Sequence, residues 1–467
     1  MSNEGLNINQ FNRAYFIGIG GIGMSALARY FNFQGWKVGG YDKTSTPLTA
    51  LLEKEGIEIH YEDFGPSLPE DFKNIDTTLV IYTPAIPVNF GELLHVQYSG
   101  YVVKKRAEVL GMITRDSKAL GVAGTHGKTT TSALLAYLLN ESELKCNAFL
   151  GGISTNFNSN FVSGDSNLTV VEADEFDRSF LQLNPFASII TSTDADHLDI
   201  YGSNDDFLIG FKEYVKRIHP EGYLVRHADV VLKHPNEITY ALNQEADFSG
   251  INPRFEDGRF LIDLKTPSGN WNDIELGVPG LHNAENAIAC IALCLKLGLT
   301  EDVIRHGLKS FSGVKRRFEY HIKEDNFVYI DDYAHHPTEI KALVSSVRLL
   351  YPNQRITGVF QPHLFTRTRD FFNEFAFELS QLDEVILLPI YPAREEPIAG
   401  ITSEALLAKI SIADKKVMSP DEAVSLLIER NQAGVERSRD DSSTVLLTIG
   451  AGDIDRIVPQ LKTEFAL

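Results

Sequence analysis

Eight consecutive residues near the start of the chain's second quarter have the types and order needed to hold a phosphate chain. They are Gly124, Thr125, His126, Gly127, Lys128, Thr129, Thr130 and Thr131. Glycine amides can cradle phosphate oxygens, the Lys128 ammonium can neutralise them, and the Thr129 hydroxyl can ligate Mg²⁺. One position departs from the usual loop, because the glycine expected five residues before Gly127 is Val122. We predict a variant P-loop that binds nucleotide phosphate. The alternative is a glycine turn that precedes a lysine by chance.

Acidic residues follow two apolar runs after this loop. Glu172 and Asp174 come at the end of the first run, and Asp196 and His197 come after the second. Carboxylates are the ligands that Mg²⁺ prefers, and Mg²⁺ bridges substrate phosphates. His197 could be a metal ligand, a phosphate contact or a base. These residues predict a magnesium site in the same domain as the P-loop.

A second glycine turn lies close to the N-terminus. Its glycines are Gly18, Gly20, Gly21 and Gly23. They satisfy G-x-G-x-x-G, and Asp42 follows about twenty residues on, where it could meet a ribose hydroxyl. Taken alone, this pattern favours an NAD-type site. A helix N-terminus after a glycine turn binds any diphosphate, however, so a nucleotide sugar fits equally well.

Cations gather in the last third of the chain. Arg316 and Arg317 end a run of three consecutive cations, which in so acidic a chain would suit a transferring phosphoryl group. Arg367 and Arg369 lie in a loop with histidine and glutamine neighbours, a composition that suits a carboxylate clamp. The alternative for that loop is surface solubility.

The elements that must position these residues alternate between strand, polar loop and helix. This alternation predicts an α/β fold with parallel sheets and helices on both faces. The unusual residues follow the strands, where open sheets place their sites. Residues 225–275 are interpreted as a peripheral β segment, and residues 151–154 as a turn. Residues 281–297 form a strongly apolar helix whose first residues include His282, Asn283 and Asn286. These could be caps or could bind a purine edge.

The length of 467 residues predicts about three domains. We expect a Rossmann-like domain at 1–105, a central P-loop domain with a mostly parallel sheet at 106–313, and a second Rossmann-like domain at 314–467. The first boundary lies near the basic cluster Lys104, Lys105 and Arg106, whose simplest interpretation is a solvated linker.

Composition excludes several classes of protein. A net charge of −20 argues against a nucleic-acid-binding surface. No apolar run is long enough to span a bilayer, and the N-terminus lacks a basic-then-apolar signal pattern. The three cysteines form no disulfide or zinc framework. The sequence therefore predicts a cytoplasmic protein without membrane insertion. It carries no signal of oligomeric state.

Taken together, the motifs resemble those of the Mur ligases, the ATP-dependent amino-acid ligases of bacterial cell-wall precursor synthesis. The resemblance covers nearly the whole chain. It rests on residues 124–130, 172–175, 282–286 and 331–338, which occur in the family's order. Residues 17–25 and 360–370 resemble the members that act on UDP-N-acetylmuramate and L-alanine.

The resemblance implies a three-domain ligase. ATP would phosphorylate the lactyl carboxylate of UDP-N-acetylmuramate, and the amine of L-alanine would displace phosphate from the acyl phosphate. A carboxylate is a poor electrophile, and phosphorylation supplies a leaving group. The protein would mostly position groups and stabilise charge.

It also implies roles around ATP and the UDP-sugar. Lys128 would bridge phosphates, Thr129 and Glu172 would hold the first Mg²⁺, and His197 would hold the second. The glycines of the first turn and Asp42 would bind the UDP-sugar. Several relatives carry a carbamylated lysine near the second metal. Lys212 is a candidate for this, but its spacing from His197 does not align firmly.

The remaining roles concern adenosine, the transferred phosphate and the amino acid. His282, Asn283 and Asn286 would line the adenine. Asp332 would reach the ATP ribose, and Arg316 or Arg317 the transferring phosphate. His336, with Arg367 or Arg369, would seat the alanine and its carboxylate.

Three alternatives remain. The nearest is the muropeptide-recycling ligase of the same family, which adds a tripeptide to the same UDP-sugar, although its glycine turn and later loop look different. An NAD-linked oxidoreductase would explain the first glycine turn but leave the P-loop and acidic clusters unexplained. A non-enzymatic nucleotide switch would not need the clamp-like loops of the last domain.

Overall fold

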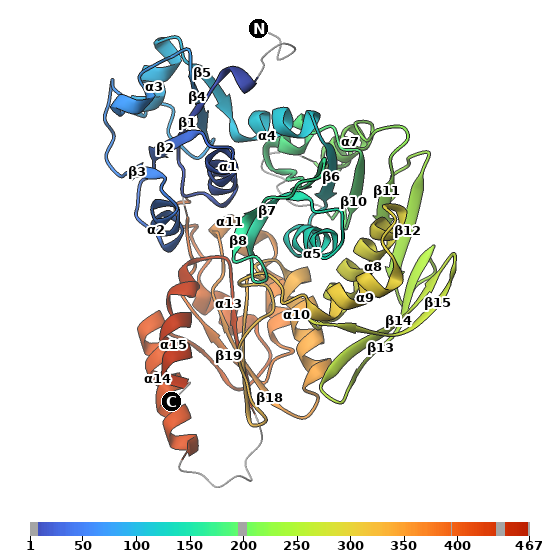
Figure 1. The fold of residues 1–467 in the computed structure, drawn as a ribbon. Helices are drawn as coiled ribbons and strands as arrows, with labels where there is room; N and C mark the ends of the chain where they lie inside the picture. Colours follow the sequence, from blue (N-terminus) through green and yellow to red (C-terminus); the bar gives the residue numbers. More distant parts are fainter. Residues whose placement is uncertain (1–7, 195–202, 394, 436–443, 466–467) are drawn as a thin grey trace. The chain divides into compact units, whose positions relative to one another are not determined.

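The computed structural model describes residues 8–194, 203–393, 395–435 and 444–465 (Figure 1). Within these ranges, no helix has the length and apolar character needed to cross a membrane. The chain divides into two compact units. The first holds residues 1–251, 263–274 and 285–312, and the second holds 252–262, 275–284 and 313–467.

The first sheet has five strands in the order β3-β2-β1-β4-β5, all paired in parallel. Its strands are β1 (Arg13–Ile17), β2 (Lys37–Tyr41), β3 (Glu58–His60), β4 (Thr78–Tyr82) and β5 (Val102–Lys105). Its helices are α1 (Ile22–Phe33), α2 (Pro47–Lys54), α3 (Gly91–Tyr98) and α4 (Arg106–Arg115), with 3-10 turns η1 (Ile8–Gln10) and η2 (Glu70–Phe72). Strands buried on both faces read as continuous apolar runs, as β1 and β4 do.

The second sheet has ten strands in the order β15-β14-β13-β12-β11-β10-β6-β9-β7-β8. Those nearest the P-loop are β6 (Lys118–Ala123), β7 (Asn147–Ser154), β8 (Ser159–Val162), β9 (Leu168–Glu172) and β10 (Ala187–Ile190). The rest are β11 (Leu224–His227), β12 (Glu237–Leu242), β13 (Phe248–Glu256), β14 (Arg259–Thr266) and β15 (Gly269–Leu276), so the predicted peripheral β segment is confirmed. The helices are α5 (Lys128–Asn140), η3 (Phe176–Gln182), α7 (Asn204–Val215), α8 (Leu281–Lys296) and α9 (Glu301–Ser310).

The predicted turn at residues 151–154 is wrong, because these residues belong to strand β7. The glycine at 151 is needed for close approach rather than for turning. A Cβ atom there would lie 2.3 Å from both carboxylate oxygens of Glu172. Glycine in a strand commonly marks such a contact or a bulge.

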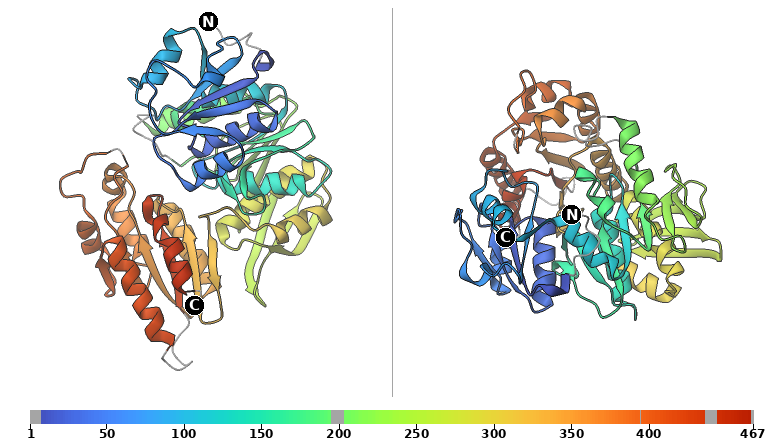
Figure 2. Two further views of the ribbon diagram at one scale, coloured as in Figure 1. Left: turned by 60° about the vertical axis from the view of Figure 1, so that its left-hand side comes forward. Right: turned by 90° about the horizontal axis from the view of Figure 1, so that it is seen from above.

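The third sheet has six strands in the order β16-β17-β21-β18-β19-β20. Only the edge pair β16–β17 is antiparallel. The strands are β16 (Glu319–Lys323), β17 (Phe327–Asp332), β18 (Arg355–Phe360), β19 (Glu384–Leu387), β20 (Lys415–Val417) and β21 (Thr444–Ile449). The helices are α10 (Pro337–Leu350), α11 (Phe365–Asp370), α12 (Phe372–Leu379), α13 (Ser403–Lys409), α14 (Pro420–Val435), η4 (Asp453–Arg456) and α15 (Val458–Phe465). The three sheets can be followed in Figure 2.

The first and second sheets share one apolar core. Helix α1 packs against strands β7 and β8, and the Tyr30 ring of α1 lies 5.4 Å from that of Phe149 and 5.8 Å from that of Phe161. Aromatic pairs at these separations bury a large area and favour fixed geometry. The helix that follows the first glycine turn is therefore held against the strands beside Glu172.

Candidate functional site

The predicted P-loop joins strand β6 to helix α5. Gly124 and Gly127 have φ values of 129° and 80°, which favour glycine. A Cβ atom at Gly124 would lie 2.1 Å from the hydroxyl oxygen of Thr191, so no other residue fits there without a shift. Thr129 and Thr130 are buried in the first turn of α5, whose amides point toward the loop. This arrangement can bind phosphate.

The Lys128 ammonium folds back onto its own loop. It donates to the carbonyl oxygens of Gly124 at 2.6 Å and Thr125 at 3.2 Å, and it pairs with the carboxylate of Glu175 at 2.8 Å. Burial acts to lower the pKa of Lys128, but the carboxylates of Glu175, Asp174 and Glu172 outweigh it and raise that pKa. Lys128 is therefore a firmly charged group at the loop.

Glu175 is the anionic partner of this pair and is almost fully buried. Burial raises the pKa of Glu175 to about 7, against the effect of the Lys128 ammonium. The sequence showed an acidic run here, but it did not indicate which carboxylate meets the lysine. Loss of a neighbouring ammonium raises the pKa of a buried carboxylate. A phosphate that draws Lys128 away would therefore raise the pKa of Glu175.

Glu172 is the last residue of β9, at the carboxyl end of the sheet. Its carboxylate accepts a hydrogen bond from the Gly151 N–H at 3.2 Å. Carboxylate and threonine hydroxyl oxygens are hard donors of the kind Mg²⁺ prefers, so Glu172 and Thr129 fit the predicted metal chemistry. His197 lies outside the described residues.

The first glycine turn joins β1 to α1, and its predicted acidic partner is Asp42. The Asp42 carboxylate accepts from the Gly20 N–H at 2.7 Å. A Cβ atom at Gly20 would lie 2.8 Å from that same carboxylate oxygen. Asp42 therefore holds the turn in shape, in addition to any ribose contact.

A cavity of about 250 Å³ connects this turn with the acidic strand end. Its lining includes Gly21, Gly23, Arg106, Gly151 and Glu172. A ligand whose diphosphate lies at the turn could therefore extend toward Glu172. A nucleotide sugar has this shape and charge distribution.

Arg106 is a site residue that the sequence analysis interpreted as linker. Its guanidinium lies over the first turn, 2.8 Å from where a Cβ atom of Gly23 would be, and 3.8 Å from the Asp174 carboxylate. The signal was the run of three cations ending at Arg106. What the sequence could not show is that helix α4 returns this side chain to the cavity.

The start of α8 carries the predicted adenine residues. Asn286 lies against the P-loop, since a Cβ atom at Gly127 would be 2.7 Å from its amide oxygen. Asn283 instead donates to the Pro279 carbonyl at 2.8 Å, within its own loop. His282 contacts the Ser346 hydroxyl at 3.4 Å. The structure thus brings Asn286 to the nucleotide loop, whereas Asn283 contacts its own loop and His282 contacts helix α10.

The two candidate arginines of the second unit differ in their contacts. Arg316 donates to the Asp331 carboxylate at 3.2 Å and to the Gly450 carbonyl at 2.6 Å, so its guanidinium holds β17 to the loop after β21. Both guanidiniums lie over the Tyr333 ring, that of Arg316 at 5.1 Å and that of Arg317 at 4.8 Å. The Arg316 guanidinium is thus occupied by contacts within the protein, whereas the Arg317 guanidinium lies beside the loop after β17.

Asp332 is held by backbone donors. Its carboxylate accepts from the Phe318 N–H at 2.7 Å and the Ala334 N–H at 2.8 Å. Burial raises the pKa of Asp332 to about 6, even though Arg317 acts to lower it. Asp332 therefore fixes the loop that carries Arg317.

His336 and His335 take different places. His336 is the N-cap of α10, where its ring accepts from the Thr338 N–H at 3.3 Å, and it is buried against the Phe371 ring at 4.5 Å. The His335 ring lies 6.0 Å from the ring of His363. Proline at the first helical position fixes which histidine becomes the cap.

The structure gathers His363 and Arg367 beside His335. The Arg367 guanidinium lies 3.5 Å from the His363 ring nitrogen. Burial, together with His335 and Arg367, lowers the pKa of His363 to about 4, so His363 is neutral at neutral pH. Arg369 pairs with its neighbour Asp370 at 2.8 Å and is half-exposed. Sequence reasoning assigned no role to His335, and it noted His363 only as the histidine neighbour of the two arginines.

Two other clusters lie apart from these groups. Lys212 lines a separate cavity of about 530 Å³, which includes Lys216 and Lys233 but no residue of the P-loop. Glu319, His321 and Asp331 are the only group with metal-ligand spacing in the described part of the chain. The Arg316 guanidinium already pairs with Asp331 there, and the Arg316 backbone N–H donates to the Glu319 carboxylate.

Family models match three consecutive parts of the chain. The Mur ligase family catalytic domain matches residues 13–118, the Mur ligase middle domain 122–294, and the Mur ligase glutamate ligase domain 316–452. A UDP-N-acetylmuramate–L-alanine ligase of Flavobacterium psychrophilum is 49% identical over 98% of this chain and 99% of its own. One of Cytophaga hutchinsonii is 46% identical over 98% and 97%.

Solved structures agree with these sequence matches. A crystal structure of the UDP-N-acetylmuramate–alanine ligase MurC from Thermotoga maritima has a TM-score of 0.78 and 28% identity, covering 97% of this chain and 98% of that one. A murein peptide ligase from Psychrobacter arcticus has a TM-score of 0.69 and 20% identity, covering 97% and 98%, a likeness of fold alone.

Proposed function

This chain belongs to the Mur ligase family, and from that premise we propose that it joins L-alanine to the lactyl carboxylate of UDP-N-acetylmuramate with ATP as phosphoryl donor. The curated relatives with this name match nearly the full length of both chains. The domains would be those predicted, at 1–105, 106–313 and 314–467. A cytoplasmic location fits the three free cysteines, all of which are buried.

One observation carries the proposal in the structure. A single cavity is lined both by the glycine turn after β1 and by Glu172 at the end of β9. A UDP diphosphate bound at Gly21 and Gly23 would direct the sugar and its lactyl group toward the acidic strand end. Arg106 over that turn supplies a positive charge for the diphosphate.

The reaction balances in two steps. An oxygen of the lactyl carboxylate attacks the γ-phosphorus of ATP, and the bond to the ADP oxygen breaks. The alanine amine then attacks the acyl carbon, loses a proton, and phosphate leaves with the electrons of the C–O bond. Since the protein forms no covalent bond in either step, its contribution is positioning and charge stabilisation.

At the P-loop, Lys128 would exchange Glu175 and the loop carbonyls for phosphate oxygens. The amides of residues 124–130 would hold the same phosphates, and Asn286 would lie on the adenine side with His282 and Asn283. Thr129 and Glu172 would hold Mg²⁺, with His197 at a second ion. Bound Mg²⁺ supplies charge neutralisation on the phosphate oxygens.

In the second unit, the contacts favour one member of each arginine pair. Arg317 would reach the transferring phosphate, because Arg316 is already bound to Asp331 and Gly450. Arg367 would bind the alanine carboxylate with His363 and His335, while His336 shapes the loop as a helix cap. Asp332 would reach the ATP ribose, and it also fixes the loop that carries Arg317.

The alternatives have less support. A tripeptide-adding ligase shares the fold, but the structure compared above is only 20% identical to this chain. The oxidoreductase hypothesis rests on Gly18, Gly20, Gly23 and Asp42, and it leaves the P-loop and the acidic residues at Glu172 unexplained.

The test is amino-acid-dependent phosphate release. The protein is incubated with ATP, Mg²⁺ and UDP-N-acetylmuramate, together with L-alanine, another amino acid, or L-alanyl-γ-D-glutamyl-diaminopimelate. We expect release with L-alanine. Release that needs the tripeptide would establish the recycling reaction instead, and release independent of any amine would contradict the ligase proposal.

A further inference from the structure

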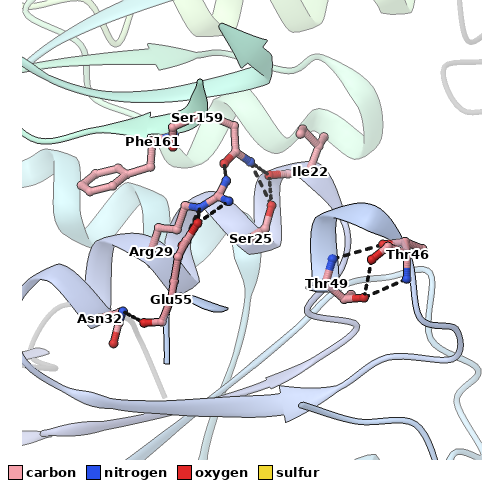
Figure 3. Close-up of polar contacts among 10 residues, drawn as sticks. Ile22, Ser25, Arg29, Asn32, Thr46, Thr49, Glu55, Ser159 and Phe161 are labelled. Carbon is pink, nitrogen blue, oxygen red and sulfur yellow. Dashed lines mark hydrogen bonds and ion pairs between the residues drawn. The ribbon is translucent and has the colours of Figure 1, made fainter. Parts of the chain in front are cut away.

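A buried amide on the second sheet contacts the start of the helix that follows the first glycine turn, and its partners Ile22, Ser25 and Arg29 are labelled in Figure 3. Asn160, on β8, donates from Nδ2 to the Ile22 carbonyl at 2.5 Å and to the Ser25 hydroxyl at 2.9 Å. Ile22 is the first residue of α1 and directly follows Gly21. Asn160 is fully buried, so both contacts form away from water. It therefore grips the turn at the point where the helix begins.

Arg29 fixes which way this amide points. Its Nη1 donates to Oδ1 of Asn160, while Nε and Nη2 bind the Glu55 carboxylate at 2.8 and 2.7 Å. A guanidinium can only donate, so the amide oxygen must face Arg29 and the amide nitrogen must face Ile22. We call Asn160, Arg29, Ile22 and Ser25 the Asn160 cluster.

The backbone at Asn160 lies opposite the irregular part of strand β7, at the other end of the cavity. Phe149 pairs with Phe161 and Ser154 pairs with Ser159, so residues 150–153 of β7 face Asn160 alone. This irregular stretch contains Gly151, whose N–H contacts the Glu172 carboxylate. The extra residues on one strand bend it locally. Asn160 thus lies opposite the bend that brings Gly151 to Glu172.

We propose that Asn160 is a positioning residue that sets the distance between the first glycine turn and Glu172. The inference rests on the proposed function, in which a UDP-sugar spans that distance. Its diphosphate end is fixed by the turn, and its carboxylate must meet the γ-phosphate near Glu172. An error of about 1 Å between reacting groups can slow a reaction by about 100-fold. Asn160 would therefore govern turnover rather than binding of UDP.

Two variants test this. Asn160→Leu keeps the size but removes every polar contact, and Asn160→Asp keeps the acceptor for Arg29 but places a carboxylate against the Ile22 carbonyl. We expect kcat to fall by about 10- to 100-fold in both, while the Kd for UDP, measured by calorimetry, changes by less than about two-fold. The Asp variant retains its partner Arg29, which favours folding.

Asn32→Ala is the matched control. Asn32 lies on the same helix and donates to the Glu55 carbonyl at 3.1 Å, but this contact stays within the first sheet's elements. We expect its kcat to match that of the wild type. The proposal is overturned if kcat is unchanged in both Asn160 variants, or if UDP affinity falls as much as kcat.

A spin-label distance separates this inference from the proposed function. The three native cysteines are buried, so labels can be directed to Tyr98→Cys on α3 and Glu143→Cys after α5, both at exposed positions. We expect the distance between the two labels to have one narrow distribution in the protein that retains Asn160 and in its Asn32→Ala variant. The distribution should be broader in the Asn160→Leu variant. Equal widths would overturn the positioning role. A wild-type protein without L-alanine-dependent phosphate release would refute only the function.

Discussion

The two glycine turns of the first unit both join a strand to a helix, but side chains of opposite charge bind their backbone groups. After β1, the Asp42 carboxylate accepts from the Gly20 N–H at 2.7 Å. After β6, the Lys128 ammonium donates to the Gly124 and Thr125 carbonyls. One turn thus has an anion as its internal partner and the other a cation.

This difference fits the proposed roles of the two turns rather than the charge of their ligands, which are both anionic. The P-loop carries its own cation, which suits a triphosphate that moves charge during reaction. The first turn has no lysine, and its positive charge comes from Arg106 on α4. We infer that the first turn holds a ligand in place, whereas the second takes part in transfer. The following predictions test that distinction.

Lys128→Ala should give the largest difference between the roles of the two turns, because it should reduce turnover without reducing UDP affinity. We expect turnover to fall by about 1,000-fold, because the transferring charge loses its main cation, with UDP affinity within about two-fold of wild type. Turnover is measured as phosphate release and affinity by calorimetry. Lys118→Ala, an exposed lysine on the same strand β6, is the control. Equal loss of UDP binding and turnover would show that the two nucleotides are wrongly placed.

Gly151→Ala should damage the link between the turns. Its Cβ atom would lie 2.3 Å from both oxygens of Glu172, so that carboxylate must move. We expect kcat to fall by about 100-fold, with little change in the Kd for UDP. Single-turnover kinetics would locate the loss in the phosphoryl-transfer step. A normal rate would mean that Glu172 is free to shift without consequence for catalysis.

Asp42→Ala should affect only the first turn. Removing a charged hydrogen bond to the Gly20 amide should loosen the turn and weaken UDP-N-acetylmuramate binding by about 10-fold. The KM for ATP should not change. Asp71→Ala, which removes an exposed partner of Lys37, serves as the control. An increase in the KM for ATP would indicate that the first turn contacts ATP.

Glu92→Gln should have the smallest effect on turnover, and it should change the pH dependence of stability instead. Like Glu175, Glu92 is buried, and burial raises the pKa of Glu92 from 4.5 to about 7, but its partners are neutral: the Tyr15 hydroxyl at 2.6 Å and the Phe64 N–H at 2.9 Å. Between those pH values the folded chain keeps a proton that the unfolded chain has lost, so this group makes stability fall as pH rises, by at most about 3 kcal/mol.

The glutamine variant cannot ionise, so its stability should depend less on pH across that window. Urea unfolding at about pH 5 and about pH 8 measures the difference. Wild type and variant should diverge as the pH rises. Parallel curves would mean that Glu92 ionises with an ordinary pKa.

Local patterns predicted most of the fold and the P-loop. The Gly-Lys-Thr spacing requires a strand before it and a helix after it, and β6 and α5 occupy those places. The apolar runs likewise predicted parallel strands in all three sheets. These features depend on neighbouring residues, so a single sequence contains them.

Features that depend on distant contacts were missed. Residues 151–154 were interpreted as a turn because glycine is common in turns. The glycine at 151 is instead required by the close approach of Glu172, twenty-one residues on. Arg106 was interpreted as linker because nothing nearby shows where α4 directs it. The sequence places His336 directly before Pro337, but the approach of His335 to His363 depends on a contact between residues 28 positions apart.

The Asn160 cluster has a consequence for modularity. Helix α1 contributes Arg29 and Ile22, but the residue that joins them belongs to strand β8 of the second sheet, more than a hundred positions later. A chimera with a transplanted first domain would therefore cut through a shared interface, whatever its linker. Such a chimera should keep the parental orientation of the first sheet against the second only when both sides of that interface come from one parent.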